Sequence, residues 1–236
     1  MSHGKAAITL NEVSAGYGPR VVLHGVTAEV PDARITAIVG ANGAGKSSLL
    51  NVIAGVLPTI GGSVTTTGLE RPAYVTQHSD VSDALPITVR AAVAMGRWAR
   101  RGPWRRLTAE DRAVVDDCLA RLDITAIADR RLGTLSGGQR QRALVAQGLA
   151  QRSGVLLLDE PTAGLDPRAR ILIDRALTVT RDEGVTVLRV THDLATAGHA
   201  DHCLLLRDGH LAAEGPPDSV LTPGQVAEAW GLPPLR

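Results

Sequence analysis

The sequence has no phenylalanine, and aromatic residues make up only 2% of its 236 positions. Hydrophobic residues still account for 44% of the chain, so it can bury a sizeable core, built from leucine, valine, isoleucine and alanine. Cysteine is also rare, and Cys118 and Cys203 stand far apart. Two distant cysteines give no disulfide framework and favour a reducing cytoplasm.

The sequence also lacks an excess of either charge, since 25 basic residues are balanced by 24 acidic ones and the net charge is +1. A balanced charge provides no overall field that would attract nucleic acid or a membrane surface. No stretch approaches the roughly 18 apolar residues of a membrane-spanning helix, and residues 1–7 have no apolar signal core. Any work at a membrane is therefore predicted to depend on another chain that crosses it.

Lysine is scarce among the basic residues, because only Lys5 and Lys46 are lysines. Lys46 belongs to the run Gly40-Ala-Asn-Gly-Ala-Gly45-Lys46-Ser47, which matches the phosphate-binding pattern G-x-x-x-x-G-K-[ST]. A predicted buried strand (35–39) precedes the run and a predicted helix (48–54) follows it. Backbone N–H groups at such a helix start point at an anion, and a compact ammonium suits the crowded cradle. We therefore expect a bound nucleoside triphosphate with these candidate contacts: Gly40, Asn42, Gly43, Gly45, Lys46, Ser47 and Ser48.

A second group of candidates ends the apolar run Val155-Leu-Leu-Leu-Asp159-Glu160. A fully buried strand would deliver both acids to the carboxyl edge of a parallel sheet, where ligands bind in open α/β folds. Asp159 is then a candidate ligand of Mg²⁺ together with the Ser47 hydroxyl. Glu160 is a candidate to orient and deprotonate an attacking water.

A third group is the turn Leu135-Ser-Gly-Gly-Gln139. Two glycines that open a helix expose N–H groups beside a serine hydroxyl, which makes a second phosphate-binding helix end. One γ-phosphate does not need both cradles from the same chain. We therefore expect Ser136, Gly138 and Gln139 to close over nucleotide held by a second copy, although the pentapeptide alone also fits an ordinary start of a helix.

With these motifs in order, the sequence resembles the ATP-binding subunit of an ABC transporter over nearly all of its length. Leu135–Gln139 carries most of this resemblance, because that signature is specific to the family. Tyr17, in a predicted loop, resembles the aromatic residue that stacks on adenine, and Gln77 resembles the glutamine that senses γ-phosphate and Mg²⁺. His192 in Thr191-His192-Asp193 matches the switch histidine, and Ala163–Asp166 matches the loop that touches the partner chain.

The resemblance implies an ATPase whose cofactors are ATP and Mg²⁺. Two small departures, Ala41 for the usual proline and Ser48 for the usual threonine, keep the needed backbone or hydroxyl. The implied catalytic residues are Glu160, His192, Gln77 and Lys46, and the implied metal ligands are Ser47, Gln77 and Asp159. The implied partners are a second copy with ATP at the interface, a separate membrane permease and a solute-binding protein, with no nucleic acid. The chain would then lie in the cytoplasm, at the inner face of the cell membrane.

The fold implied is an α/β P-loop NTPase with an N-terminal antiparallel β subdomain and an inserted helical lobe. We place the α/β core at about 1–78 and 144–215, the helical lobe at about 79–143 and a short C-terminal tail at about 216–236. The tail is expected to carry at most one short helix, around residues 225–230. Apolar patterning predicts helices at 109–122, 135–148, 168–182 and 194–200. It also predicts strands at 63–67, 73–76, 155–158 and 185–190, and a terminal strand pair at 203–212.

The solute is inferred from the segment that faces the permease in this family. Here that segment, His78–Arg90 and then Val93–Arg97, is similar to the zinc/manganese uptake branch, which implies import of a divalent metal ion, zinc first or manganese. Siderophore and haem importers share parts of the pattern and stay open as alternatives. A non-transport ABC ATPase, an ATP-regulated module without turnover and an export subunit are further alternatives.

Two other clusters receive a structural interpretation. The basic run Arg97–Arg106, with Trp98 and Trp104, is predicted to be a solvated surface of the helical lobe. His199, His202 and Cys203 invite a metal site, but they lack a further ligand at suitable spacing. We interpret them as structural and leave metal binding to experiment.

Overall fold

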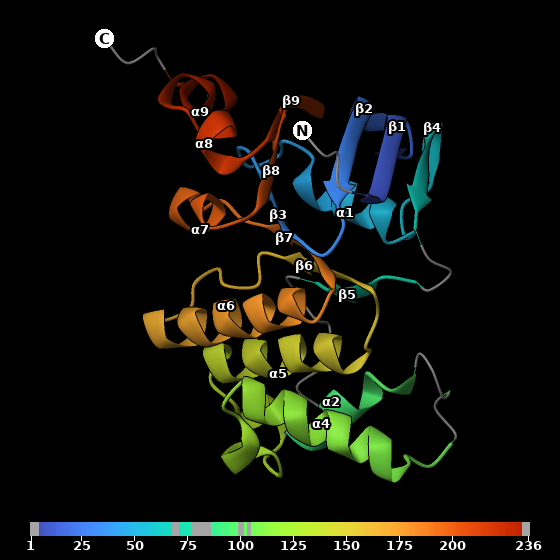
Figure 1. The fold of residues 1–236 in the computed structure, drawn as a ribbon, viewed down its shortest axis with the longest axis vertical. Coiled ribbons are helices and arrows are strands. Elements are labelled where there is room, and N and C mark those ends of the chain that lie inside the picture. Colours follow the sequence, from blue (N-terminus) through green and yellow to red (C-terminus); the bar gives the residue numbers. More distant parts are fainter. Residues whose placement is uncertain (1–4, 68–70, 77–85, 99–101, 103–104, 233–236) are drawn as a thin grey trace.

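The computed structural model describes residues 5–67, 71–76, 86–98, 102 and 105–232, and it shows two β-sheets and a helical lobe (Figure 1). This architecture confirms the predicted α/β fold with an antiparallel β subdomain and a lobe of helices. Gln77 and the predicted permease-facing residues 78–85 lie outside the described residues, as does Trp104. The predicted domain boundaries remain a prediction.

The first sheet is antiparallel, in the order β2-β1-β4, and the second has six strands in the order β5-β6-β7-β3-β8-β9. In this order, each strand from β5 through β3 to β8 pairs in parallel with the next, and β9 pairs antiparallel with β8. The strands are β1 (Ala6–Tyr17), β2 (Arg20–Pro31), β3 (Ile35–Val39), β4 (Thr59–Thr66), β5 (Ala73–Val75), β6 (Val155–Asp159), β7 (Thr186–Val190), β8 (His202–Arg207) and β9 (His210–Gly215).

Helices cover both faces of the six-stranded sheet. Helices α5 and α6 lie on one face, with α2 and α4 beyond them, and α1 with the antiparallel sheet lies on the other (Figure 1). The helices are α1 (Lys46–Ile53), α2 (Val89–Met95), α4 (Ala109–Arg121), α5 (Gly137–Ala150), α6 (Pro167–Asp182), α7 (Leu194–Gly198), α8 (Pro217–Val220) and α9 (Pro223–Ala229), with 3-10 turns at Thr125–Ile127 and Leu132–Thr134.

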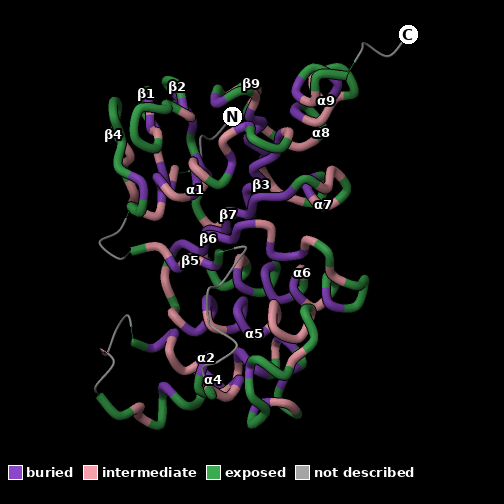
Figure 2. The backbone as a smooth tube through the Cα atoms, turned by 180° about the vertical axis from the view of Figure 1, so that it is seen from behind, coloured by how far each residue is buried: buried purple, intermediate pink, exposed green. Residues whose placement is uncertain are grey.

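The three central strands are buried along their whole length (Figure 2). Covered faces explain their continuous apolar sequences, because a strand buried on both sides has no solvent face to fill with polar residues. Asp159, Val190 and Ile38 align across β6, β7 and β3. The segments that follow these three strands therefore leave the sheet side by side at one edge.

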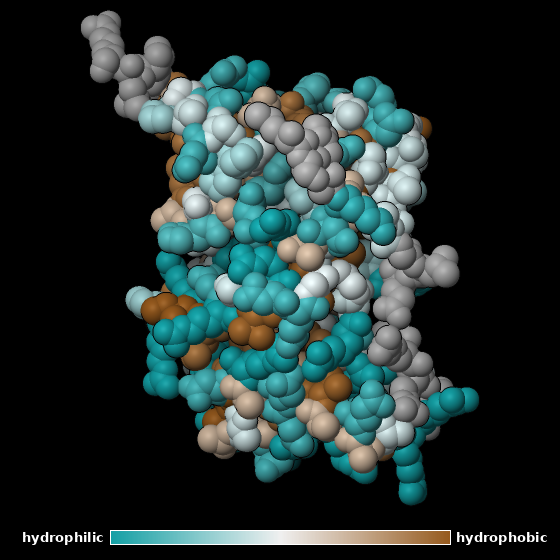
Figure 3. All heavy atoms as spheres, viewed as in Figure 1, coloured by the Kyte–Doolittle hydropathy of each residue, from teal (hydrophilic) through white to brown (hydrophobic). Residues whose placement is uncertain are grey.

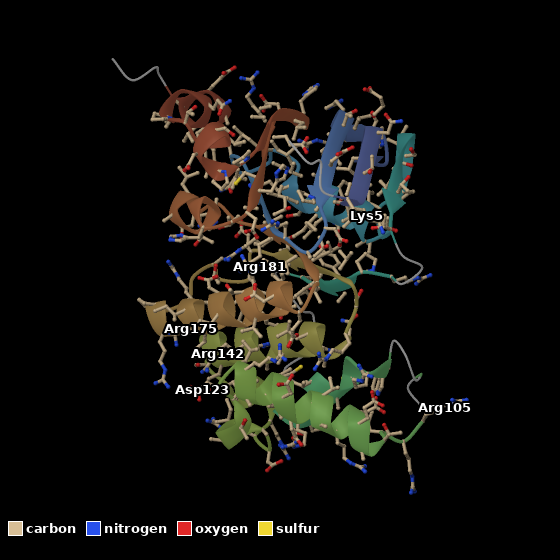
Figure 4. All side chains as sticks on the ribbon, viewed as in Figure 1. Lys5, Arg105, Asp123, Arg142, Arg175 and Arg181 are labelled. Carbon is tan, nitrogen blue, oxygen red and sulfur yellow. The ribbon has the colours of Figure 1, made fainter. Side chains whose placement is uncertain are left out.

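Arg97 corrects the prediction that the whole basic run is solvated. Its side chain is only 5% exposed; Nε donates to Asp111 Oδ1 at 2.9 Å and Nη1 donates to the Ala150 carbonyl at 2.8 Å. Asp111 lies in the first turn of α4 and closes a capping box with Thr108. The guanidinium thereby joins the end of α2 to α4 and α5. Arg105, in contrast, projects away from the body of the lobe (Figure 4).

The C-terminal tail carries two short helices, α8 and α9, so the prediction of at most one is wrong. Each begins at a proline, whose fixed φ suits a first helical position, and Thr222 caps α9. Val220 and Ala229 pack against β3 and β8. This packing holds the tail against the core.

No helix in the described ranges is long and apolar enough to cross a membrane. The face seen in Figure 3 is largely hydrophilic, with hydrophobic atoms gathered over α6, which exposes Ile171 and Val179.

Candidate functional site

The loop after β3 has a backbone that only glycine accommodates at its two ends. Gly40 has φ +149°, and a Cβ there would stand 2.2 Å from the carbonyl oxygen of Leu206. Gly45, at the N-cap of α1, has φ +98°, where side chains are strained, and a Cβ would meet Leu23 at 2.9 Å. The glycine spacing of the motif is therefore needed to bring this loop close to its neighbours.

Lys46, the first residue of α1, is 6% exposed and lies inside this loop. Its Nζ donates to the carbonyl oxygens of Gly40 at 2.9 Å and Ala41 at 2.8 Å. Burial lowers the pKa of the Lys46 ammonium, and the nearby charges of Glu160 and Asp159 oppose that shift. The loop therefore holds a cation whose carboxylate neighbours are the last residue of β6 and the residue that follows it.

Glu160 follows β6 with a left-handed backbone, at φ +47°. Its N–H donates to the Val190 carbonyl at 3.2 Å, which continues the pairing of β6 with β7. One carboxylate oxygen, Oε1, lies 3.3 Å from Nδ1 of His192, and the side chains are 14% and 56% exposed. A non-glycine residue held at positive φ is common at functional sites, where the surrounding structure maintains the strain.

A cavity of about 860 Å³ joins these groups. Tyr17, Glu160 and His192 line it together with the phosphate loop, so segments that are far apart in the sequence meet here. Tyr17 is the last residue of β1 rather than part of a loop, and it is 53% exposed. Seven residues predicted to contact the nucleotide, from the phosphate loop and the start of α1, line this cavity: Gly40, Asn42, Gly43, Gly45, Lys46, Ser47 and Ser48.

Asp159 is buried and is not among the residues that line the cavity. It ends β6, is 6% exposed, and is close enough to Lys46 to act on its pKa. Ser47, next to Lys46, lines the cavity itself. A carboxylate and a hydroxyl are hard oxygen donors of the kind that Mg²⁺ prefers, so this pair fits that ion.

The turn at Ser136–Gln139 forms the start of α5 and does not line the cavity among the described residues. Ser136 Oγ accepts from the Gln139 N–H at 3.3 Å, and the Ser136 N–H donates to Gln139 Oε1 at 3.2 Å. Gly138 lies beside Asp166, because a Cβ on it would stand 3.3 Å from Asp166 Oδ2. The turn and the 163–166 loop are therefore neighbours within one chain.

Three cavity-lining residues were not predicted: Arg20, Val22 and Trp230. The hairpin register pairs Tyr17 with Arg20, so a hairpin interpretation of Gly18-Pro19 would have found Arg20. Trp230 follows α9 and is partly buried against the cluster formed by β3, β8 and α7. No sequence pattern links it to the phosphate loop, since only tertiary packing of the tail brings it there.

Trp230 is expected to report nucleotide binding by its fluorescence. In a variant that keeps Trp230 alone (Trp98→Phe with Trp104→Phe), ATP should change the emission intensity or maximum, because the indole lines the cavity. Titration with ATP measures this change, and the complementary variant Trp230→Phe is the control. Unchanged emission from the variant that keeps Trp230 alone would place Trp230 away from the nucleotide.

His199, His202 and Cys203 each turn to a different partner. His199 Nδ1 lies 2.7 Å from the Ala195 carbonyl oxygen, His202 Nε2 lies 3.3 Å from Glu214 Oε1, and the Cys203 thiol donates to the Ala197 carbonyl at 3.6 Å. Burial raises the pKa of the Cys203 thiol to about 12. Over the described residues, no group of three or more His, Cys, Asp or Glu side chains is arranged to hold a metal ion.

Comparisons with known proteins agree on one family. A family profile described as ABC transporter matches residues 23–163. The chain is 36% identical to the manganese transport system ATP-binding protein MntB of Listeria monocytogenes, over 94% of this chain and 95% of that protein. It is 36% identical to the zinc import ATP-binding protein ZnuC of Halorhodospira halophila (95% and 83%) and 40% identical to the hemin import ATP-binding protein HmuV of Streptomyces coelicolor (92% and 80%).

A solved structure has the same fold. It is described as an inward-facing conformation of a putative metal-chelate type ABC transporter, with a TM-score of 0.86 and 26% identity, covering 97% of this chain and 90% of that one. The similarity therefore extends over the tail as well as the sheet and the lobe.

Proposed function

This chain belongs to the ABC transporter family as an ATP-hydrolysing subunit, and on that premise we propose that it binds Mg²⁺-ATP beside Lys46 and powers import of a divalent metal ion. The observation that supports this most strongly is the cavity in which Tyr17, the phosphate loop, Glu160 and His192 meet. The cavity is large enough for a nucleotide, since ligand sites of this kind usually span about 300–1,000 Å³.

The triphosphate lies along the loop at the start of α1, where N–H groups and the helix dipole favour negative charge. The Lys46 ammonium, now bound to two carbonyls, exchanges those contacts for phosphate oxygens and gains from the opposite charge. The exposed ring of Tyr17 receives the adenine. Each part of the nucleotide is thereby matched to a group of suitable chemistry.

Ser47 and Asp159, with Gln77, are the residues that would hold Mg²⁺. When bound, the ion supplies positive charge that offsets the charge of the phosphates. Asp159 and the neighbouring Glu160 have separate tasks. Asp159 would bind the metal ion, and Glu160 acts on the attacking water. At 6% exposure, the Asp159 carboxylate is shielded from bulk water.

Hydrolysis depends on the side chains that line the cavity next to the loop. Glu160 accepts a proton from the attacking water, and His192 holds the carboxylate in place and contacts the γ-phosphate. Lys46 stabilises negative charge on the transferred phosphoryl group. These contributions are mainly positioning and electrostatics, which is what phosphoryl transfer needs.

A second copy of the chain completes the site. Ser136, Gly138 and Gln139 lie at a helix start that does not line the cavity of their own chain, which supports a role across an interface. The partner's Ser136 and the partner's Gly138 would then close over the γ-phosphate, so ATP would hold the dimer together. We further propose a separate membrane permease and a solute-binding protein as the other components, with this chain at the cytoplasmic face.

The proposed solute is zinc, or manganese as the next choice. Support comes from the segment that resembles the zinc/manganese branch and from the relatives named for these metals. A second candidate is a metal chelate such as haem or a siderophore. It is favoured by the 40% identity to the hemin protein and by the metal-chelate type structure.

Uptake in cells that lack this chain tests the proposal. Labelled zinc, manganese and hemin would be supplied under metal limitation, and either wild type or Glu160→Gln would be added back. Loss of zinc or manganese uptake, restored by wild type alone, is the expected result. Loss of hemin uptake instead would identify the chelate branch, and unchanged uptake of all three would contradict both candidates while leaving the ATPase assignment intact.

A further inference from the structure

Both tyrosines of the chain take part in one chain of side-chain hydrogen bonds. Asn51, on α1, donates from Nδ2 to the phenol oxygen of Tyr17 at 3.2 Å, and its Oδ1 accepts from the Tyr74 hydroxyl at 2.9 Å. Tyr17 belongs to β1, Asn51 to α1 and Tyr74 to β5. Asn51 lies five residues after Lys46 on α1, the helix that follows the phosphate loop. The hydrogen bonds therefore connect Tyr17, where the base is proposed to bind, to the helix that begins at the proposed phosphate site.

Tyr74 decides which way the Asn51 amide points. An asparagine amide has one acceptor side and one donor side, so a donor held at Oδ1 directs Nδ2 in the opposite sense. Burial raises the pKa of Tyr74 to about 12, and the charges of Asp159 and Tyr17 act in the same direction. The phenol therefore keeps its proton at neutral pH and can remain a donor to Asn51.

The Tyr17 ring gains from such a partner because more than half of the residue is exposed to solvent. The side chain is 53% exposed and ends a strand at the rim of the cavity. An exposed ring that orders only when ligand arrives lowers affinity by the entropy that it loses, whereas a ring already held in place avoids part of that loss. A bond at the phenol oxygen fixes the far end of the ring.

We propose that Asn51 is a positioning residue for the nucleotide base: held by Tyr74, it orients the Tyr17 ring so that the ring is ready to stack on adenine. The inference rests on the proposed nucleotide site and adds two residues to it, neither of which lines the cavity as described. Asn51 and Tyr74 thus act through Tyr17, and their effect is confined to ligands that carry a base.

The test compares ATP with inorganic tripolyphosphate, which has the phosphates but no base. Dissociation constants for both would be measured by calorimetry for wild type, Asn51→Leu, Tyr74→Phe and Tyr17→Phe. Each variant is expected to bind ATP about 3- to 10-fold more weakly, the effect of losing one hydrogen bond, and to bind tripolyphosphate as wild type does. Asn11→Leu, the same substitution at an exposed position of β1, is the matched control and should change neither constant.

A double variant shows whether Asn51 and Tyr17 act through the same hydrogen bond or affect ATP binding independently. Tyr17→Phe combined with Asn51→Leu should bind ATP no more weakly than the weaker single variant, because both remove the same bond. Independent, multiplicative losses would overturn the proposal, and so would a parallel loss of tripolyphosphate binding or unchanged ATP binding in all three single variants. If Asn51→Leu fails to fold, Tyr17→Phe carries the test alone, since its ring is exposed.

The wild-type measurement distinguishes a failure of the proposed nucleotide site from a failure of the positioning role of Asn51. Wild type that binds ATP more tightly than tripolyphosphate supports the proposed nucleotide site whatever the variants do. Wild type that binds neither would overturn the proposed function together with this inference. Wild type that binds ATP while the variants match it would overturn the inference alone.

Discussion

Glu160→Gln is expected to reduce ATP hydrolysis by roughly 10²- to 10⁴-fold while ATP binding is retained, the contribution typical of a positioned general base. Glutamine has nearly the shape of glutamate but cannot accept the proton of the attacking water. The left-handed backbone at this residue and its N–H bond to Val190 do not depend on the carboxylate, so the fold should survive. Phosphate release under multiple turnover and a binding titration measure the two effects.

Because hydrolysis would otherwise separate the two copies, the same variant should remain dimeric with ATP in light scattering. Glu110→Gln, an exposed position in the first turn of α4, is the matched control and should hydrolyse ATP at the wild-type rate. A Glu160→Gln protein that stays monomeric with saturating ATP would speak against ATP holding a dimer together. Undiminished turnover would remove Glu160 from the role of base.

Lys46→Met should weaken ATP binding and lower turnover by a combined factor of roughly 10²–10³, the usual effect of removing one charge-stabilising donor. Methionine keeps most of the buried aliphatic stem but has no charge and no donor for phosphate. The nearby carboxylates of Asp159 and Glu160 would then lie close to the phosphates without the cation that now neutralises part of their charge. The negative charge of the ligand would meet a more negative site.

Lysine provides an unusually simple control, because Lys5→Met alters the single other lysine of the chain. That variant should bind and hydrolyse ATP as wild type does. Calorimetry with ATP, followed by initial rates at saturating nucleotide, distinguishes a binding effect from a catalytic one. ATP affinity and turnover that are unchanged in Lys46→Met would contradict the assignment of the loop as the triphosphate site.

The parts of the site that sequence could predict are those whose chemistry is set by local spacing. A strand, a glycine loop and a helix follow one another without a break, so the pattern around Lys46 predicts both the fold of the segment and its ligand. The position of the two acids at the end of β6 and directly after it was likewise predicted from a continuous apolar run, because such a run implies a strand buried on both faces.

The unpredicted parts depend on contacts between distant segments. Arg97 stands in a basic run that indicates a solvated surface, yet Asp111 on another helix pairs with it inside the lobe. Trp230 reaches the cavity only because two proline-started helices fold the tail against β8. The bond between Asn51 and Tyr17 likewise joins a helix to the end of a strand that lies 34 residues earlier. Patterns of three to eight residues contain no information on such pairings.

The strand order β6-β7-β3 also sets the distance between the strand that leads to Glu160 and the strand that leads to the phosphate loop. Two inter-strand spacings, roughly 10 Å in all, separate the strand that leads to Glu160 from the strand that leads to the phosphate loop, with the His192 segment between them. This separation belongs to the backbone of a buried sheet and cannot adapt to a shorter ligand. On the proposed site, a nucleotide whose phosphates bind at Lys46 would extend along this sheet edge toward Glu160 and His192. We expect discrimination between ATP and ADP to follow from strand order rather than from any single side chain.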